Sequence, residues 1–308
     1  MLGTALVLCV GFVSASPSLA AQNGVIVFQR DVPDGGHFVS VSPTGQGLRS
    51  IGPPRSSELA PGNQGAAFSP DGQKIIFAAT TAVNSGYSGS GIFTMGPDGA
   101  GLMTVISSSG PSSTNPGGLT FNTPSYFPNG QEIVFSAVEG FGSEYRIYTM
   151  GLDGSARRQL TSGYEDLGAQ VSPDGAEIAF DRLRNRRSAI YMMSSAGSAP
   201  WRISAAGCDV GLGDFSPDGR ELVIVQSCGR NGAALFTMAP DGSHRRRLTR
   251  PRPGTFDTNP VFSPDGQSIA FLRGANHGQP QLFTMKANGS GIRRIAGRAS
   301  APIWQPLP

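Results

Sequence analysis

The sequence predicts an all-β protein, a six-bladed β-propeller made of four-stranded antiparallel blades. Three observations predict this fold: a Ser-Pro-Asp-Gly motif that recurs at a nearly constant spacing, four short apolar segments in each repeat, and two chain ends that complete one another. Self-similarity at a period of roughly 40 to 50 residues is typical of propeller blades.

The turn motif is the most regular element of the chain. It occurs five times, the second copy reading Phe-Pro-Asn-Gly, and its prolines are Pro70, Pro128, Pro173, Pro217 and Pro264, separated by 58, 45, 44 and 47 residues. Proline presets φ for the first turn position, Asp can bond its own backbone, and Gly accepts a positive φ. A tight hairpin therefore explains the motif without metal binding.

Each repeat contains four apolar segments bounded by turn residues. In the last full repeat, residues 259–262 precede the turn and residues 268–272 follow it, and Leu282-Phe283-Thr284-Met285 comes next. An Asn-Gly or Asp-Gly turn leads to a fourth segment, such as Arg246-Arg247-Leu248-Thr249. Short segments of β-branched and aromatic residues between such turns predict antiparallel strands.

The chain ends decide the number of blades. Residues 301–306 match residues 259–264, after which the chain stops, and residues 23–28 match the continuation at 266–271. Segments 37–41 and 48–51 supply a third and a fourth strand. We therefore expect the last blade to take one strand from the C-terminus and three from the N-terminus, which pairs two otherwise exposed edges. Residues 21–308 then form a single domain of six blades.

The N-terminus predicts export. Residues 1–20 carry no charge, are apolar from Leu2 to Val13, and end in small residues at Ala20, which is the pattern of a secretory signal peptide. We expect a periplasmic or secreted protein. Cys208 and Cys228 lie ten residues on either side of Asp218, at the tip of a predicted hairpin, so a disulfide is geometrically possible and favoured by export. Two unpaired thiols remain the alternative.

Composition argues against several classes of function. The net charge is +3 with acidic and basic residues nearly balanced, so no nucleic-acid partner is expected, and no later segment is long and apolar enough to cross a bilayer. His37, His244 and His277 occupy unrelated phases of the repeat, and no hydrolase, zinc-protease or phosphate-loop motif occurs. We expect a monomer without cofactor or resident metal.

The candidate site consists of charged residues that enter the first strands of the repeats. Counted back from the turn proline, Asp166 and Asp257 lie seven residues before it, and Glu165, Asp209 and Arg298 lie eight before it. If the first strand is innermost, these side chains surround one mouth of a central channel. They could coordinate a cation or hold a basic or polar peptide. Solubility and turn formation are the alternative explanation for such residues.

Arginines form a second pattern. One cluster comprises Arg182, Arg184, Arg186 and Arg187, and three further groups begin fourth strands: Arg157-Arg158, Arg245-Arg246-Arg247 and Arg293-Arg294. Charges on an outermost strand protect it from edge-to-edge pairing. Attraction to an anionic surface is the alternative.

The repeats resemble the propeller repeats of the TolB family of bacterial envelope proteins. The matching phrases are aromatic-Ser-Pro-Asp-Gly, Ile/Leu-aromatic-Thr-Met and Arg-Arg-x-Leu-Thr, as at Phe262–Gly266, Leu282–Met285 and Arg157–Thr161. The resemblance implies six blades and a channel that receives a partner's segment. TolB also carries an α/β domain before its propeller, and nothing between Ala21 and the first strand is expected to encode one.

These observations lead to three hypotheses for the function. The first is an exported, non-enzymatic propeller that binds a protein or peptide at the channel mouth, as an interaction or scaffold module of the envelope. The alternative is a metal-dependent hydrolase or lactonase that uses Glu165, Asp166, Asp209 and Asp257. The third is a sensor module whose partner domain lies on another polypeptide.

Overall fold

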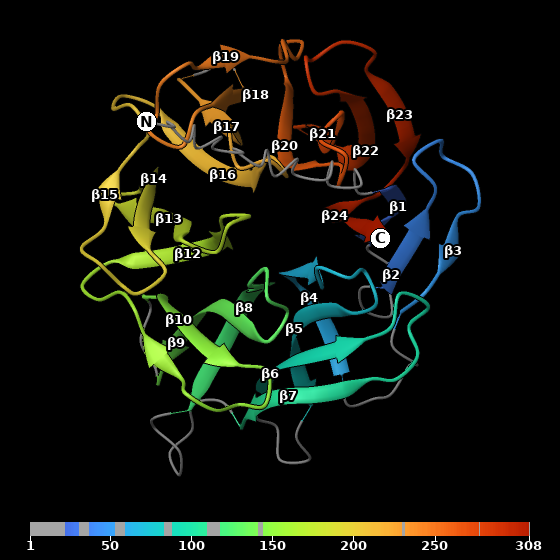
Figure 1. Ribbon diagram of the computed structural model, residues 1–308. Coiled ribbons are helices and arrows are strands. Elements are labelled where there is room, and N and C mark those ends of the chain that lie inside the picture. The colour runs from blue at the N-terminus through green and yellow to red at the C-terminus, as the bar shows by residue number, and fades with distance from the viewer. Residues whose placement is uncertain are drawn as a thin grey trace, which may run out of the picture.

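Six four-stranded antiparallel sheets are arranged in a ring (Figure 1). The computed structural model describes residues 22–30, 37–52, 59–82, 88–109, 118–140, 144–229, 232–276 and 278–307, and the predicted signal peptide lies outside them. The all-β propeller expected from the repeats is confirmed. In the described part of the chain, no helix is long and apolar enough to span a bilayer.

The first strand of each blade lies nearest the centre of the ring. For blades 1 to 6 in order, these strands are β24 (Ser300–Leu307), β4 (Leu59–Phe68), β8 (Leu119–Tyr126), β12 (Glu165–Val171), β16 (Asp209–Phe215) and β20 (Thr255–Phe262). Each contacts the first strands of both neighbouring blades, as the ring in Figure 1 shows. The ends of these strands are therefore brought together around one axis.

The other strands follow outward from the centre. The second strands are β1 (Gln22–Arg30), β5 (Ile75–Ala82), β9 (Glu132–Glu139), β13 (Glu177–Arg184), β17 (Leu222–Ser227) and β21 (Ser268–Ala275). The third strands are β2 (His37–Val41), β6 (Ser88–Met95), β10 (Arg146–Gly151), β14 (Arg187–Ser194), β18 (Ala233–Met238) and β22 (Gly278–Lys286). The outermost strands are β3 (Arg49–Ser50), β7 (Met103–Ser108), β11 (Arg158–Gln159), β15 (Trp201–Arg202), β19 (Arg246–Arg247) and β23 (Arg293–Ala296).

Blade 1 closes the ring as predicted. The C-terminal strand β24 pairs antiparallel with β1, with Ile26 opposite Trp304 and Val27 opposite Ile303. The sheet continues from β1 through β2 to β3. Both termini therefore contribute to one blade, and neither leaves an inner strand unpaired.

The hydrophobic core is divided among the interfaces between blades. Six clusters of buried apolar residues lie there, and each combines residues of two adjacent blades. Between blades 3 and 4, for example, Val134 and Ile147 pack with Ile178 and Phe180. Apolar residues at matching phases of successive repeats thus face the neighbouring blade, because a four-stranded sheet has two faces to bury.

The Ser-Pro-Asp-Gly turn is held by its own side chains. In blade 6, the hydroxyl of Ser263 donates to Oδ1 of Asp265 at 2.5 Å and accepts from the backbone N–H of Ser268 at 2.9 Å. The glycine of each of these turns also faces a turn of the preceding blade: a Cβ on Gly266 would lie 3.6 Å from the Pro217 ring. The motif therefore closes a hairpin and packs against the next turn in the ring.

Arginines of the outermost strands connect adjacent blades. Arg158 Nη1 donates to the carbonyl oxygen of Ala196 at 2.8 Å, and Arg246 Nη1 donates to that of Asn288 at 3.1 Å. Arg293 Nη2 likewise donates to Pro43 O at 2.9 Å. Each acceptor lies in the turn between the third and fourth strands of the following blade. We call this contact the arginine tie. These arginines therefore connect adjacent blades in addition to placing charge on an exposed outer strand.

Candidate functional site

The first strands define two faces of the ring. All six begin at one face, which we call the mouth face, and end at the opposite face, where the Ser-Pro-Asp-Gly turns lie. Glu165 and Asp209 are the first residues of β12 and β16, and Arg298 lies two residues before β24. The sequence-predicted site residues are therefore at one end of the inner strands.

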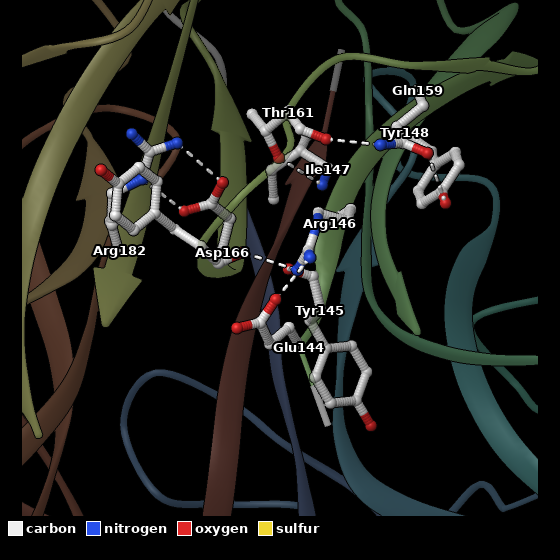
Figure 2. A network of polar contacts seen from close by, with 10 residues as sticks. Glu144, Tyr145, Arg146, Ile147, Tyr148, Gln159, Thr161, Asp166 and Arg182 are labelled. Carbon is white, nitrogen blue, oxygen red and sulfur yellow. Dashed lines mark hydrogen bonds and ion pairs between the residues drawn. The ribbon is translucent and has the colours of Figure 1, made fainter. Parts of the chain in front are cut away.

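The carboxylate of Asp166 forms an ion pair with an arginine of its own blade. Its carboxylate accepts two hydrogen bonds from Arg182, with Nε–Oδ1 at 2.7 Å and Nη2–Oδ2 at 2.8 Å (Figure 2). The two residues are cross-strand partners on β12 and β13, and Asp166 is fully buried. The guanidinium also lies over the rings of Tyr164 and Tyr191, 4.5 and 4.8 Å from their centroids. Such a two-bond pair fixes both side chains.

Blade 6 repeats the arrangement at the same phase. Asp257, also fully buried, accepts from Arg273 with Nε–Oδ1 at 2.7 Å and Nη2–Oδ2 at 2.9 Å. The Arg273 guanidinium lies over Phe271 and Phe283, 5.5 and 5.3 Å from the ring centroids. Asp166 and Asp257 thus lie at the predicted place along their strands, but their carboxylates point to arginines rather than to an open channel.

The other three predicted residues remain accessible at the mouth face. Glu165 is half-buried, and Asp209 and Arg298 are exposed. Asp209 Oδ1 accepts a hydrogen bond of 3.3 Å from the backbone N–H of Ser188, and Arg298 has a positive φ of 51°. Among the described residues, no group of three or more His, Cys, Asp or Glu side chains could hold a metal ion. The four predicted carboxylates do not gather into one ligand set.

Two further carboxylates each accept a hydrogen bond from the inner strand of the next blade. Asp181 Oδ1 on β13 accepts from the backbone N–H of Leu212 on β16 at 2.8 Å, and Asp214 Oδ2 on β16 accepts from Phe262 N on β20 at 3.0 Å. Burial raises the pKa of each of these carboxyls to about 7. Sequence reasoning missed both. The available signal was an acidic residue at a strand position where the other repeats carry uncharged residues, such as Ala78 and Leu272 for Asp181 and Ala67 and Val261 for Asp214.

The inner strands are bulged at one shared position. Five residues before the turn proline, five of the six blades have a residue with positive φ, namely Gly65, Thr123, Gly168, Asn259 and Ala301. Ladder irregularities occur in the same region. A bulge strengthens the local twist and redirects the side chains beside it. For Thr123 this conformation is uncommon, because β-branched residues disfavour positive φ.

A disulfide lies at the mouth end of blade 5. It joins Cys208, directly before β16, to Cys228, directly after β17, with the Cα atoms 4.7 Å apart. This is the pair selected by its spacing about Asp218. The bond ties the entrance of an inner strand to the end of its hairpin partner, next to the exposed Asp209. The mouth face is thereby covalently fixed in this blade.

Comparison with known proteins agrees with this architecture. Residues 210–306 match the TolB β-propeller domain family. This part of the chain is similar to TolB, and the whole chain is a six-bladed β-propeller. The Tol-Pal system protein TolB of Francisella tularensis subsp. mediasiatica is 26% identical over 202 residues, covering 63% of this chain and 42% of the relative. The propeller therefore spans about two fifths of the length of that curated relative.

Solved structures with the same fold include proteins of different names. TolB from Acinetobacter baumannii superposes on the TolB-like propeller with a TM-score of 0.71 at 20% identity, covering 92% of this chain and 66% of the other. Hydrazine synthase from Kuenenia stuttgartiensis reaches a TM-score of 0.68 at 14% identity, covering 94% of this chain and 47% of that one. At such identities the likeness concerns the fold alone, so function has to be argued from the site.

Proposed function

We propose that this TolB-like propeller is an exported, non-enzymatic binding protein that receives a protein or peptide segment at its mouth face. The observation that carries the proposal is that some charged residues of the mouth face are paired within the fold and others are not. Asp166 and Asp257 are neutralised within the fold by Arg182 and Arg273. Glu165, Asp209 and Arg298 remain available to a ligand.

The mouth face also presents an arginine-rich hairpin. The β13–β14 hairpin exposes Arg184, Arg186 and Arg187, and Arg184 lies directly opposite Arg187 in the ladder. Like charges in that position repel one another. Asn185 and Arg186 both have positive φ, at 52° and 62°, although Gly is the usual second residue of such a turn. Exposed charges of both signs favour a polar, charged partner segment over an apolar one.

Rigidity supports the same proposal. The ring is closed by β24 and β1, and the disulfide fixes the entrance to β16. Loops that are already ordered lose little conformational entropy when a partner binds. A closed propeller therefore suits the presentation of a preformed surface better than it suits an induced fit.

The signal-like N-terminus and the relatives support a location in the cell envelope. The curated relative from Francisella is named as a component of the Tol-Pal system. We propose an envelope location for this chain, periplasmic or secreted, and a monomeric propeller without a resident cofactor. The metal-dependent hydrolase is the weaker candidate, because it requires Asp166 and Asp257 as ligands and both are held by arginines.

Site-specific photocrosslinking tests the proposal. A photoreactive amino acid is placed at Arg298, and the chain is crosslinked in cells that export it. We expect a discrete adduct of higher mass than the chain alone. Replacing Glu165 with Gln and Asp209 with Asn should weaken that adduct, since both charges flank the same mouth.

The matched control places the photoreactive residue at Arg220, an exposed side chain on the turn face. We expect no adduct from that position. Equal adducts from the two positions, or none from Arg298 in cells that export the chain, would contradict a mouth-face binding site.

A further inference from the structure

The interface between blades 2 and 3 lacks an arginine tie, as do two other interfaces among the described residues. The compared position lies five residues after the Asp or Asn that precedes the glycine of the turn between the third and fourth strands. In β7 this residue is Met103, and in three other blades it is Arg158, Arg246 or Arg293. Trp201 stands at the equivalent position of blade 4, and Arg49 of blade 1 donates to Ser40 of its own blade. Arg158, Arg246 and Arg293 form ties to the next blade, whereas the Met103 side chain is 60% exposed. A thioether cannot donate to the carbonyl oxygens of the following turn. Blade 2 therefore has no arginine tie to blade 3.

The turn of blade 3 also stands away from blade 2. A Cβ built on Gly154 would lie 3.9 Å from the nearest backbone oxygen, that of Val105. At the equivalent Gly289 and Gly45, the oxygen of the preceding blade would be 2.8 and 3.3 Å away. All three glycines have similar positive φ, so the difference reflects the spacing of the blades rather than the shape of the turn. At Gly242 and Gly99, the backbone oxygen of the preceding blade lies closer still, although blades 4 and 1 form no tie. The wider spacing is therefore a feature of this interface and not a result of the missing tie.

A pocket lies at this interface. It has a volume of about 480 Å³, which is within the usual range for small-molecule sites. Its lining includes Ile106 of β7, Leu119 and Phe121 of β8, and Tyr148 of β10. Its polar lining includes Glu139, Arg157 and Gln159. The strand β7 is also longer than any other outermost strand, with six residues, and extends the wall.

Glu139 and Arg157 carry opposite charges within this pocket without pairing to each other. Both are exposed, and neither forms a hydrogen bond or ion pair with another described residue. Tyr148 lines the same pocket, and its hydroxyl donates to Gln159 Oε1 at 3.0 Å (Figure 2). Burial, with Glu139 next, raises the pKa of Tyr148, and Arg157 acts in the opposite direction. Both charges thus reach the same buried ring.

We propose that the pocket between blades 2 and 3 binds a small zwitterion of about dipeptide size. Its ammonium group pairs with Glu139 and its carboxylate with Arg157. The apolar part of the ligand lies on Ile106 and Leu119, beside the ring of Tyr148. A single-charged ligand satisfies only one of the two groups, and a neutral one satisfies neither. This inference does not depend on the mouth-face proposal, because the residues of the two sites differ.

Calorimetric titration of the purified chain tests the pocket with three probes. Alanyl-alanine carries both charges, N-acetyl-alanyl-alanine only the carboxylate, and alanyl-alanine amide only the ammonium. We expect saturable binding of alanyl-alanine at millimolar concentration. Each capped probe should bind roughly tenfold more weakly, since a charge-assisted hydrogen bond is lost.

Two variants assign the charges. In Glu139→Gln, alanyl-alanine should lose its advantage over the acetylated probe, while its advantage over the amide remains. Arg157→Gln should show the reverse. Because both residues are exposed and unpaired, the melting temperature of the unliganded variants should stay at the wild-type value.

The controls are Glu132→Gln at the other end of β9 and Arg220→Gln on the turn face, and neither should change binding. No saturable binding of alanyl-alanine overturns the proposal. So does binding in which both preferences persist in Glu139→Gln and Arg157→Gln. Loss of partner adducts at Arg298 with unchanged dipeptide binding would contradict the mouth-face proposal alone.

Discussion

Asp166 and Arg182 lie directly opposite each other on β12 and β13 and form a two-bond ion pair that is almost completely removed from solvent. Asp257 and Arg273 repeat it two blades further round the ring. The pair recurs at the same position in two blades and lies against aromatic rings in both. Its role is therefore to stabilise the packing of the blades. The acidic side chains that the sequence places at the channel mouth therefore have two roles, since Asp209 and Glu165 remain outside such pairs.

Asp166→Asn should strongly destabilise the propeller. The substitution leaves the Arg182 guanidinium buried without its counter-charge, and breaking a buried pair in this way costs about 3–5 kcal/mol. Urea unfolding followed by circular dichroism measures the change. The neighbouring half-buried Glu165→Gln is the matched control, expected to change stability by less than about 0.5 kcal/mol.

The double variant Asp166→Leu with Arg182→Met separates charge burial from packing. Replacing a whole buried pair with apolar residues of similar size is often neutral. We expect it to recover most of the stability lost in Asp166→Asn. A wild-type unfolding midpoint for Asp166→Asn, or a double variant no more stable than it, would contradict the role assigned to the pair.

The ionisation of Asp181 and Asp214 should make the stability of the fold depend on pH. Their pKa in the folded protein is raised to about 7 by burial, from an ordinary value of 3.8. The folded state therefore binds more protons than the unfolded state between these values, and stability falls as pH rises from about 4 to about 7. The check is the thermal midpoint measured across this range.

Asp181→Asn should flatten that slope, because Asn keeps an oxygen acceptor for the Leu212 N–H but does not ionise. The variant is expected to be more stable than the wild type at pH 8 and similar at pH 4. The turn residues Asp71, Asp174 and Asp218 act in the opposite sense, since hydrogen bonds from serine hydroxyls lower their pKa. Their contribution is lost only as pH falls below about 4. An unchanged slope in Asp181→Asn would refute the assignment.

Reduction of the Cys208–Cys228 disulfide should lower stability by roughly 3 kcal/mol, the value for a loop of about this length. The bond closes a segment of 20 residues that spans the whole β16–β17 hairpin. Thermal unfolding with and without dithiothreitol measures the loss. Cys208→Ser with Cys228→Ser is the control, and reductant should not shift its midpoint. A reductant effect of equal size on that variant would show that the disulfide is not its cause.

Met103→Arg should install the tie that blade 2 lacks. The new guanidinium would reach the carbonyl oxygens at Leu152 and Asp153, as Arg158 reaches those of blade 4. We expect the melting temperature to rise by about 1–3 °C, because the new hydrogen bonds add to stability. Arg246→Ala, which removes an existing tie, should lower the melting temperature by a similar amount. A melting temperature of Met103→Arg at or below the wild-type value would contradict the expected tie.

The fold could be predicted closely from the sequence, and the site only in part. Pro264, Asp265 and Gly266 form a turn whose hydrogen bonds are contained within a few residues, so the motif indicates a hairpin wherever it occurs. The position of Asp166 along its strand followed from the same repeat. Its partner did not, because Arg182 lies 16 residues away and the pairing depends on the bulge between Leu167 and Gln170.

The sequence by itself determined the number of blades and the closure of blade 1, since these depend on local turn chemistry repeated at a regular spacing. It left the pairing of Cys208 with Cys228 open. Only the tertiary structure decided which residues of adjacent blades face each other. Asp181 bonds a backbone N–H of the next blade, and the pocket beside Tyr148 lies between the outer strands of blades 2 and 3. Contacts of this kind depend on the spacing and rotation of whole sheets, which the packing of buried side chains sets and no single repeat encodes.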